Sequence, residues 1–180
     1  YRTQARSLSE QAATATAEAT ETRANTWCSS ISASNAEAIP QLYDDYKNAS
    51  EQLRQSIDSQ CPKRVTTAVF MTTYTPDEIV KVTGECSLNA DNTVATCSGT
   101  AELYRDKADT LTSFSDTTVV LALEHPTDAD HSSVTHVDKD AVTVTVPTDG
   151  NKADFTFDVP FDTAWGIYYK LIPQSFFPNE

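Results

Sequence analysis

The chain has 180 residues, 39% of them hydrophobic and 9% aromatic, which is enough for one sizeable core or for a smaller core with an elongated extension. The formal net charge at pH 7 is −13, and residues 65–180 carry 18 acidic against 6 basic side chains, whereas residues 1–64 carry 8 against 7. Such an acidic surface repels phosphate backbones and anionic headgroups, so we expect neither nucleic-acid binding nor electrostatic docking to a membrane; the charge serves solubility or a basic partner.

Residues 2–31 predict one helix, because they are rich in Ala, Thr, Glu and Gln and contain neither Pro nor Gly. Small or apolar residues recur along it in steps of three and four, at Ala5, Leu8, Ala12, Ala15 and Ala19. An Ala seam of this kind buries little area. It therefore predicts either a membrane-proximal stalk that pairs weakly with a second copy, or a helix laid against the rest of the protein, and we assign residues 1–35 to this helical spacer or stalk.

A second helix is predicted for residues 40–59. A Ser-rich break precedes it, Pro40 suits its first turn and Pro62 follows its end. Larger apolar side chains, from Ile39 to Ile57, form a stripe along one face, so we expect this helix to pack on the domain that follows.

From residue 65 onward the apolar residues alternate with a period of two. This pattern predicts about seven strands, at 65–74, 79–88, 94–104, 117–124, 141–146, 153–159 and 165–172. The predicted fold class is α+β, with two N-terminal helices followed by a curved antiparallel β-sheet. Residues 36–180 would form one α+β domain in which helix 40–59 packs on the sheet 65–172.

The four cysteines, Cys28, Cys61, Cys86 and Cys97, include no CxxC pair, so the spacing of zinc ribbons and thioredoxins is missing. An even number of cysteines without metal-binding spacing favours disulfides, and disulfides favour an oxidising, extracytoplasmic compartment.

Cys86 and Cys97 are predicted to pair across a β-hairpin. If they face each other, the same register sets Val80 opposite Leu103 and Gly84 opposite Gly99, and it places Asp91 and Asn92 at the centre of the turn. A four-residue loop, 90–93, makes the cysteines a non-hydrogen-bonded pair with Cα atoms about 4.5 Å apart, which suits a cross-strand disulfide better than a two-residue loop.

The partner of Cys28 is harder to predict. A helical hairpin would place it near residue 44, and a single kinked rod would hold it roughly 50 Å from Cys61. A Cys28–Cys61 bond requires residues 29–39 to run back extended beside the second helix. We favour that bond over pairing between chains.

Residues 141–159 predict a second hairpin with its turn at Asp149 and Gly150. Its register sets Val142 opposite Phe157, Val144 opposite Phe155 and Val146 opposite Ala153. One face of this hairpin would pack in the core and the other would be exposed to solvent.

No segment carries a nucleophile elbow or a phosphate-binding loop, so we predict no catalytic residue and no cofactor. One polar stretch has side chains typical of metal ligands: Glu124, His125, Asp128, Asp130, His131, His136, Asp138 and Asp140. The spacing in this stretch is irregular and we assign no metal site to it. Phe176 and Phe177 near the C-terminal end form a candidate partner-binding patch.

These features together predict a non-enzymatic protein-interaction or scaffold domain of a bacterial cell-envelope protein. The chain begins at Tyr1 rather than Met, so we expect an anchored ectodomain whose N-terminal signal peptide or transmembrane helix has been removed. We expect an envelope or membrane protein as partner and a weak homodimer through the Ala-rich helix. The alternatives are a cone-shaped pocket protein similar in outline to NTF2, binding a small ligand, and a secreted hydrolase without a recognisable motif.

Overall fold

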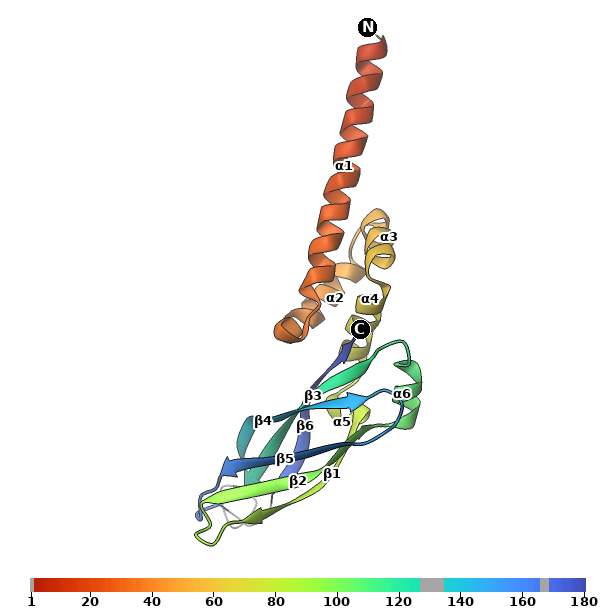
Figure 1. Cartoon of the computed structure of the whole chain (residues 1–180). Coiled ribbons are helices and arrows are strands. Elements are labelled where there is room, and N and C mark those ends of the chain that lie inside the picture. Colours follow the sequence, from red (N-terminus) through yellow and green to blue (C-terminus); the bar gives the residue numbers. More distant parts are fainter. Residues whose placement is uncertain (1, 127–134, 166–168) are drawn as a thin grey trace. The chain divides into compact units, whose positions relative to one another are not determined.

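The computed structural model describes residues 2–126, 135–165 and 169–180, with side chains from Thr16 onward in the first range. The chain divides into two compact units, Tyr1–Thr73, which is helical, and Tyr74–Glu180, which contains the strands (Figure 1). The predicted α+β class is confirmed. The division between the two units falls between residues 73 and 74. The division of the chain at residues 35 and 36 stays a prediction.

The helical unit consists of α1 (Arg2–Ser30), the short 3-10 helix η1 (Ala33–Ala38), α2 (Ile39–Lys47), α3 (Glu51–Gln60) and α4 (Pro62–Thr73). The single helix predicted for residues 40–59 is thus two helices. They separate because Ser50 begins a new helix: its Oγ accepts a hydrogen bond from the backbone N–H of Leu53 at 3.2 Å.

The strand predicted for residues 65–74 is wrong, since residues 65–73 belong to helix α4. Val65, Thr66 and Thr67 have the β-branched side chains typical of strands. In α4 the Thr66 and Thr67 hydroxyls donate to the carbonyl oxygens of Pro62 and Lys63, one turn earlier in the same helix. Pro62 opens this helix and does not simply end the previous one.

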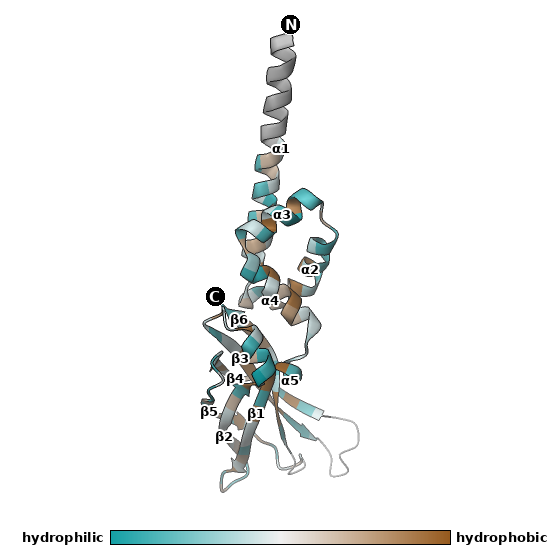
Figure 2. Ribbon diagram, turned by 90° about the vertical axis from the view of Figure 1, so that its right-hand side faces the viewer, coloured by the Kyte–Doolittle hydropathy of each residue, from teal (hydrophilic) through white to brown (hydrophobic). Residues whose placement is uncertain are grey.

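The core of the helical unit draws side chains from every long helix. Figure 2 shows hydrophobic segments on α2, α3 and α4. From Thr16 onward, the buried apolar residues of the unit are Ala24, Trp27, Cys28, Ile31, Ile39, Leu53, Ile57, Cys61, Ala68 and Phe70. Of the predicted Ala seam, Ala19 is exposed, and the side chains of Ala5, Leu8, Ala12 and Ala15 lie outside the described residues. None of the described helices is both long and apolar enough to cross a bilayer.

The β unit contains the short helices α5 (Pro76–Ile79) and α6 (Arg105–Thr110), together with strands β1 (Val80–Leu88), β2 (Val94–Leu103), β3 (Asp116–Pro126), β4 (Thr135–Pro147), β5 (Ala153–Pro160) and β6 (Lys170–Asn179). These six described strands form two three-stranded antiparallel sheets, ordered β1-β2-β5 and β4-β3-β6. The prediction of one curved sheet of about seven strands is therefore corrected to two sheets of three strands each. The described residues do not form the single curved sheet on which the comparison with a cone-shaped pocket protein was based.

The β1–β2 hairpin follows the predicted register, including Cys86 opposite Cys97 and Gly84 opposite Gly99. The backbone N–H of Asn89 donates to the oxygen of Val94 at 3.0 Å, which closes a four-residue loop, 90–93. The Cα atoms of the two disulfide-bonded cysteines are 4.0 Å apart, as expected for a non-hydrogen-bonded pair. Here the turn residues and the two cysteines were sufficient to fix the register.

The predicted pairing of β4 with β5 is wrong, although the predicted faces are right. Val144, Val146, Phe155 and Phe157 are buried and alternate with exposed residues. However, β4 pairs with β3, where Val144 faces Val119, and β5 pairs with β2 in the other sheet. The turn at Asp149 and Gly150 therefore leads from one sheet to the other. Alternation identifies the buried face of a strand, but it does not identify the strand's neighbour.

The central strand β3 has an irregularity on each side. In β4 the residue opposite changes from Val142, facing Leu121, to Asp138, facing Leu123, and in β6 Gln174 is an extra residue. Asp140 in the β4 bulge has a positive φ of 53°. The Gln174 amide oxygen accepts a hydrogen bond from the backbone N–H of Asp140 at 2.8 Å, and its amide nitrogen donates to the Asp140 carboxylate at 2.9 Å. These two hydrogen bonds connect the two bulges.

The last predicted strand, 165–172, is displaced toward the C-terminus and is observed as β6. Asp162 holds a turn before it, because its backbone oxygen accepts from Trp165 N–H and its carboxylate accepts from Ala164 N–H. Trp165 consequently lies before the strand and not inside it.

Candidate functional site

The helical unit has an open groove between α1, α2 and α3, with a volume of about 520 Å³. We call it the Trp27 groove. Its lining residues are Thr22, Arg23, Thr26, Trp27, Ser30, Leu42, Asp45, Asn48, Ala49, Leu53 and Ile57. The buried apolar side chains of Trp27, Leu53 and Ile57 form its floor. The exposed side chains of Arg23, Asp45 and Asn48 form its rim.

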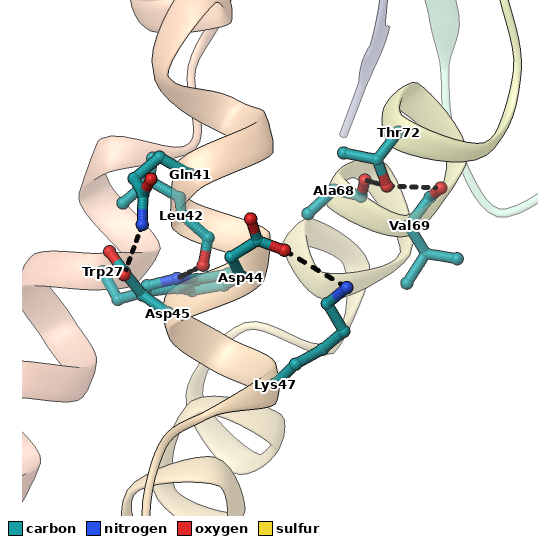
Figure 3. A network of polar contacts seen from close by, with 9 residues as sticks. All are labelled: Trp27, Gln41, Leu42, Asp44, Asp45, Lys47, Ala68, Val69 and Thr72. Carbon is teal, nitrogen blue, oxygen red and sulfur yellow. Dashed lines mark hydrogen bonds and ion pairs between the residues drawn. The ribbon is translucent and has the colours of Figure 1, made fainter.

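Trp27 is fixed at the floor by contacts on two sides. Its indole Nε1–H donates to the backbone oxygen of Leu42 at 2.7 Å (Figure 3). Its ring also lies 5.6 Å from that of Tyr46. The side chain is only 7% exposed. A buried indole N–H needs an acceptor, and the carbonyl of α2 supplies it, so α1 and α2 are held in register beside the groove.

A disulfide fixes the C-terminal end of α1. Cys28 and Cys61 are bonded within the chain, with Cα atoms 6.0 Å apart, as the sequence favoured. One turn beyond Cys61, the Arg64 guanidinium donates to the backbone oxygen of Cys28 at 2.6 Å. The extended run expected for residues 29–39 is wrong, because η1 occupies residues 33–38. Instead, η1 and the break at residues 48–50 turn the chain back toward α1, so that Cys61 reaches Cys28.

The rim of the groove carries both charges. Arg23 and Asp45 are exposed, and Gln41 donates to the Asp45 carboxylate at 2.9 Å (Figure 3). Within the described part of the chain, no acidic group forms an ion pair with Arg23. The rim therefore offers a guanidinium and a carboxylate to a bound partner.

Tyr46 connects the two helices on one side of the groove. Its hydroxyl donates to Asp58 Oδ1 at 2.6 Å, joining α2 to α3. This hydrogen bond, assisted by burial and by the negative charge of Asp58, raises the pKa of Tyr46 to about 12.

Because the pKa of Tyr46 is raised above its ordinary value of about 10, its stabilising effect is complete below pH ~10 and is lost as pH rises through about 12. We expect Tyr46→Phe to lower the free energy of unfolding by about 1–2 kcal/mol at pH 8, with the difference from the natural chain shrinking toward pH 12. Urea unfolding at several pH values would measure this. Tyr43→Phe is the control, and an equal effect of both changes would contradict the assignment.

The polar stretch considered as a metal site is only partly brought together. The inward row of β3 ends in His125, which is fully buried, and His136 of β4 lies directly opposite. Asp138 lies between the two imidazoles: Oδ2 is 2.8 Å from His125 Nε2 and Oδ1 is 3.1 Å from His136 Nε2. If the register that pairs Thr117 with Val146 continued along β3, Asp138 would lie directly opposite His125. The register change in β4 places His136 opposite His125 instead.

Aromatic rings cover these imidazoles. Trp165 stacks on His136 with centroids 4.3 Å apart and lies 4.9 Å from His125, while Phe161 meets His125 edge-on at 5.6 Å. We call His125, His136, Asp138, Phe161 and Trp165 together the His125 cluster. Nδ1 of His125 is buried and has no hydrogen-bond partner among the residues described here. Both Nε2 atoms face carboxylate oxygens, which accept hydrogen bonds, so the tautomer that fits this geometry carries its hydrogen on Nε2. In that tautomer the buried Nδ1 of His125 is an acceptor without a donor.

Within residues 2–126, 135–165 and 169–180, no group of three His, Cys, Asp or Glu side chains could hold a metal ion. The Nε2 atoms of His125 and His136 both face the Asp138 carboxylate, and they do not point toward a common position that a metal ion could occupy. Glu124 alternates to the opposite side of β3 and Asp140 is bonded to Gln174. Asp128, Asp130 and His131 lie outside the described residues.

The aromatic pair near the C-terminal end lies in β6. Phe176 is 4% exposed and faces Val119, so it belongs to the core, and Phe177 is half-buried opposite Thr118. A role of these residues in binding a partner remains a prediction.

Reasoning from the sequence did not find the Trp27 groove or the covering role of Trp165. A usable signal existed for the first, because Trp27 is a large side chain in a helix made mostly of Ala, Thr and Glu. No local signal places Trp165 over His136, since the contact joins residues that are distant in sequence.

The fold and these sites define the class only broadly, as a disulfide-bonded α+β protein with a helical unit and a two-sheet β unit. Comparisons with protein-family models, with curated proteins and with solved structures find no match for this chain. The two disulfides indicate an oxidising, extracytoplasmic compartment.

Proposed function

We propose that this chain is a non-enzymatic protein-binding or scaffold module of a bacterial cell-envelope protein, and that the Trp27 groove is its contact surface for another envelope or membrane protein. Membrane anchorage and a weak homodimer through the Ala-rich part of α1 belong to the same proposal.

The groove is the observation that supports this function best. Its floor is apolar and its rim carries charges of both signs, the combination found in protein interfaces, where an apolar centre is surrounded by polar groups. Three helices line it, and the Cys28–Cys61 bond and the Tyr46–Asp58 hydrogen bond hold those helices together. A rigid groove loses little conformational entropy when a partner binds.

Site-specific photo-crosslinking in the source cells tests the proposal. A photoreactive amino acid would replace Asn48, which lines the groove, or Asp44 of α2, which is also exposed but does not line it. We expect a covalent adduct with a second protein from position 48 and little or none from position 44. Leu42→Glu, which introduces a charge among the lining residues, should reduce the adduct at position 48 at least tenfold.

Circular dichroism of each variant would confirm that the helices are intact. Equal adduct yields from the two positions, or no adduct from position 48, would contradict the proposed contact surface.

A further inference from the structure

Among the strands that the structure describes, β1 has one sheet neighbour, β2, and the backbone groups along its other edge point away from that neighbour. Cys86 and Cys97 form a non-hydrogen-bonded pair, so every second residue of β1, including Val82 and Gly84, directs its N–H and C=O outward. The Tyr169 hydroxyl confirms this direction at one position, because it donates to the outward oxygen of Cys86.

The outward groups of Val82 and Gly84 have no hydrogen-bond partner in the part of the chain that the structure describes. The side chain of Leu171 in β6 lies near Gly84, but on the face of the strand and not at its edge. Its Cδ1 atom is 3.1 Å from the position that a Cβ of residue 84 would occupy. Leu171 therefore does not extend the sheet at this edge. Gly84 is itself exposed. The edge therefore presents two donors and two acceptors that another strand could use.

The side chains of β1 show which strand fits. If Val82 of one chain lies opposite Gly84 of a second copy, in antiparallel orientation, Lys81 lies opposite Glu85 and Thr83 opposite Thr83, by the register arithmetic that holds for the β1–β2 hairpin. Lys81 and Glu85 are both exposed and point to the same face. Because the pair is two-fold symmetric, the Lys–Glu contact occurs twice.

Neighbouring registers lack this complementarity. Placing Val82 opposite Val82 sets Lys81 against Thr83, and placing Gly84 opposite Gly84 sets Lys81 against Ser87. A directly opposite pair of unlike charges stabilises an antiparallel pair, whereas like charges destabilise it.

From these observations we propose that β1 pairs antiparallel with β1 of a second copy of this chain. Val82 and Gly84 exchange four backbone hydrogen bonds with their counterparts, and Lys81 and Glu85 select the register. The two β1-β2-β5 sheets then join into one sheet of six strands. Tyr169 limits the ladder, because it already occupies the Cys86 oxygen. This dimer uses the β unit and does not depend on the Trp27 groove.

The competing explanation is that Lys81 and Glu85 protect an edge strand from pairing, as charged residues often do. Sedimentation equilibrium of the full chain, from about 10 to 500 µM because a ladder this short is a small interface, separates the two explanations. We expect the natural chain to dimerise. Lys81→Glu alone and Glu85→Lys alone each set like charges opposite one another twice, so each should dimerise about ten- to one-hundredfold more weakly.

Two further samples make the test specific. The double variant Lys81→Glu/Glu85→Lys should dimerise like the natural chain. An equimolar mixture of the two single variants should form a heterodimer, because each then supplies the charges that the other lacks. Lys139→Glu, an exposed lysine on β4, is the control for a change in net charge alone.

Dimerisation of the natural chain, its loss in both single variants and its recovery in the mixture would support the β1 dimer. A natural chain that stays monomeric over the whole range would overturn it, as would single variants that self-associate as tightly as the natural chain or a mixture that does not associate. Association through the Ala-rich helix would produce the second of these results.

Discussion

Replacing both Cys28 and Cys61 with serine is expected to lower the free energy of unfolding of the helical unit by about 3–4 kcal/mol. The bond closes a loop of 33 residues, and in the chain-entropy account a loop of that length restricts the unfolded chain by about this amount. In the folded state the same bond joins the end of α1 to the residue that links α3 and α4. It therefore holds together α1 and α3, two of the three helices that line the Trp27 groove. We therefore expect the groove to open before the β unit is affected.

Hydrogen exchange followed by mass spectrometry would locate the effect. Exchange should accelerate in residues 16–73 and stay unchanged in residues 74–126, 135–165 and 169–180, because the two units are separate compact bodies. The matched control removes Cys86 and Cys97, 11 residues apart, and should cost about 2–3 kcal/mol in the β unit alone. Faster exchange spread equally over both units would show that they do not unfold independently.

Asp138→Ala is expected to destabilise the β unit by about 2–3 kcal/mol. His125 is fully buried, and Asp138 is the only hydrogen-bond partner that the described residues provide for it. Without the carboxylate, the Nε2–H of His125 becomes a buried donor with no acceptor, which costs more than the hydrogen bond itself contributed. His136 suffers less, since its side chain is 41% exposed and water can replace Asp138.

A double-mutant cycle measures this coupling directly. His125→Leu alone should cost about 1 kcal/mol, because Asp138 keeps His136 and is 17% exposed. The variant carrying both changes should be more stable than the sum of the single effects predicts, by about 1–2 kcal/mol. Denaturant unfolding of all four chains gives these values. Asp154→Ala, at an exposed position on β5, is the control and should change stability by less than about 0.5 kcal/mol. Additive effects would argue against a buried His125–Asp138 interaction.

Several elements of the fold could be derived from local patterns. The β1–β2 hairpin was derived residue by residue, because two cysteines, two facing glycines and an Asp-Asn turn all lie within 24 residues and agree on one register. The buried faces of β4 and β5 were also correct, since a period of two determines which side chains share a face. α1 followed from the absence of Pro and Gly.

Other elements were missed where local preference and tertiary packing disagree. Residues 65–73 have β-branched side chains but form helix α4, where Thr67, Ala68 and Phe70 are buried in the helical unit. The short helix α6, Arg105–Thr110, leaves no clear periodic signal because it has fewer than two turns. The Trp27 groove requires three helices at once, so no single segment predicts it.

The sequence by itself determined the α+β class, the long first helix and the Cys86–Cys97 hairpin, since each depends on residues close together in the chain or on composition. Only the tertiary structure decided that Cys28 reaches Cys61, that β4 and β5 lie in different sheets and that Asp138 lies between two imidazoles. These arrangements depend on where the chain turns back and which strands become neighbours, and that is settled by the burial of whole faces against one another and not by any local pattern.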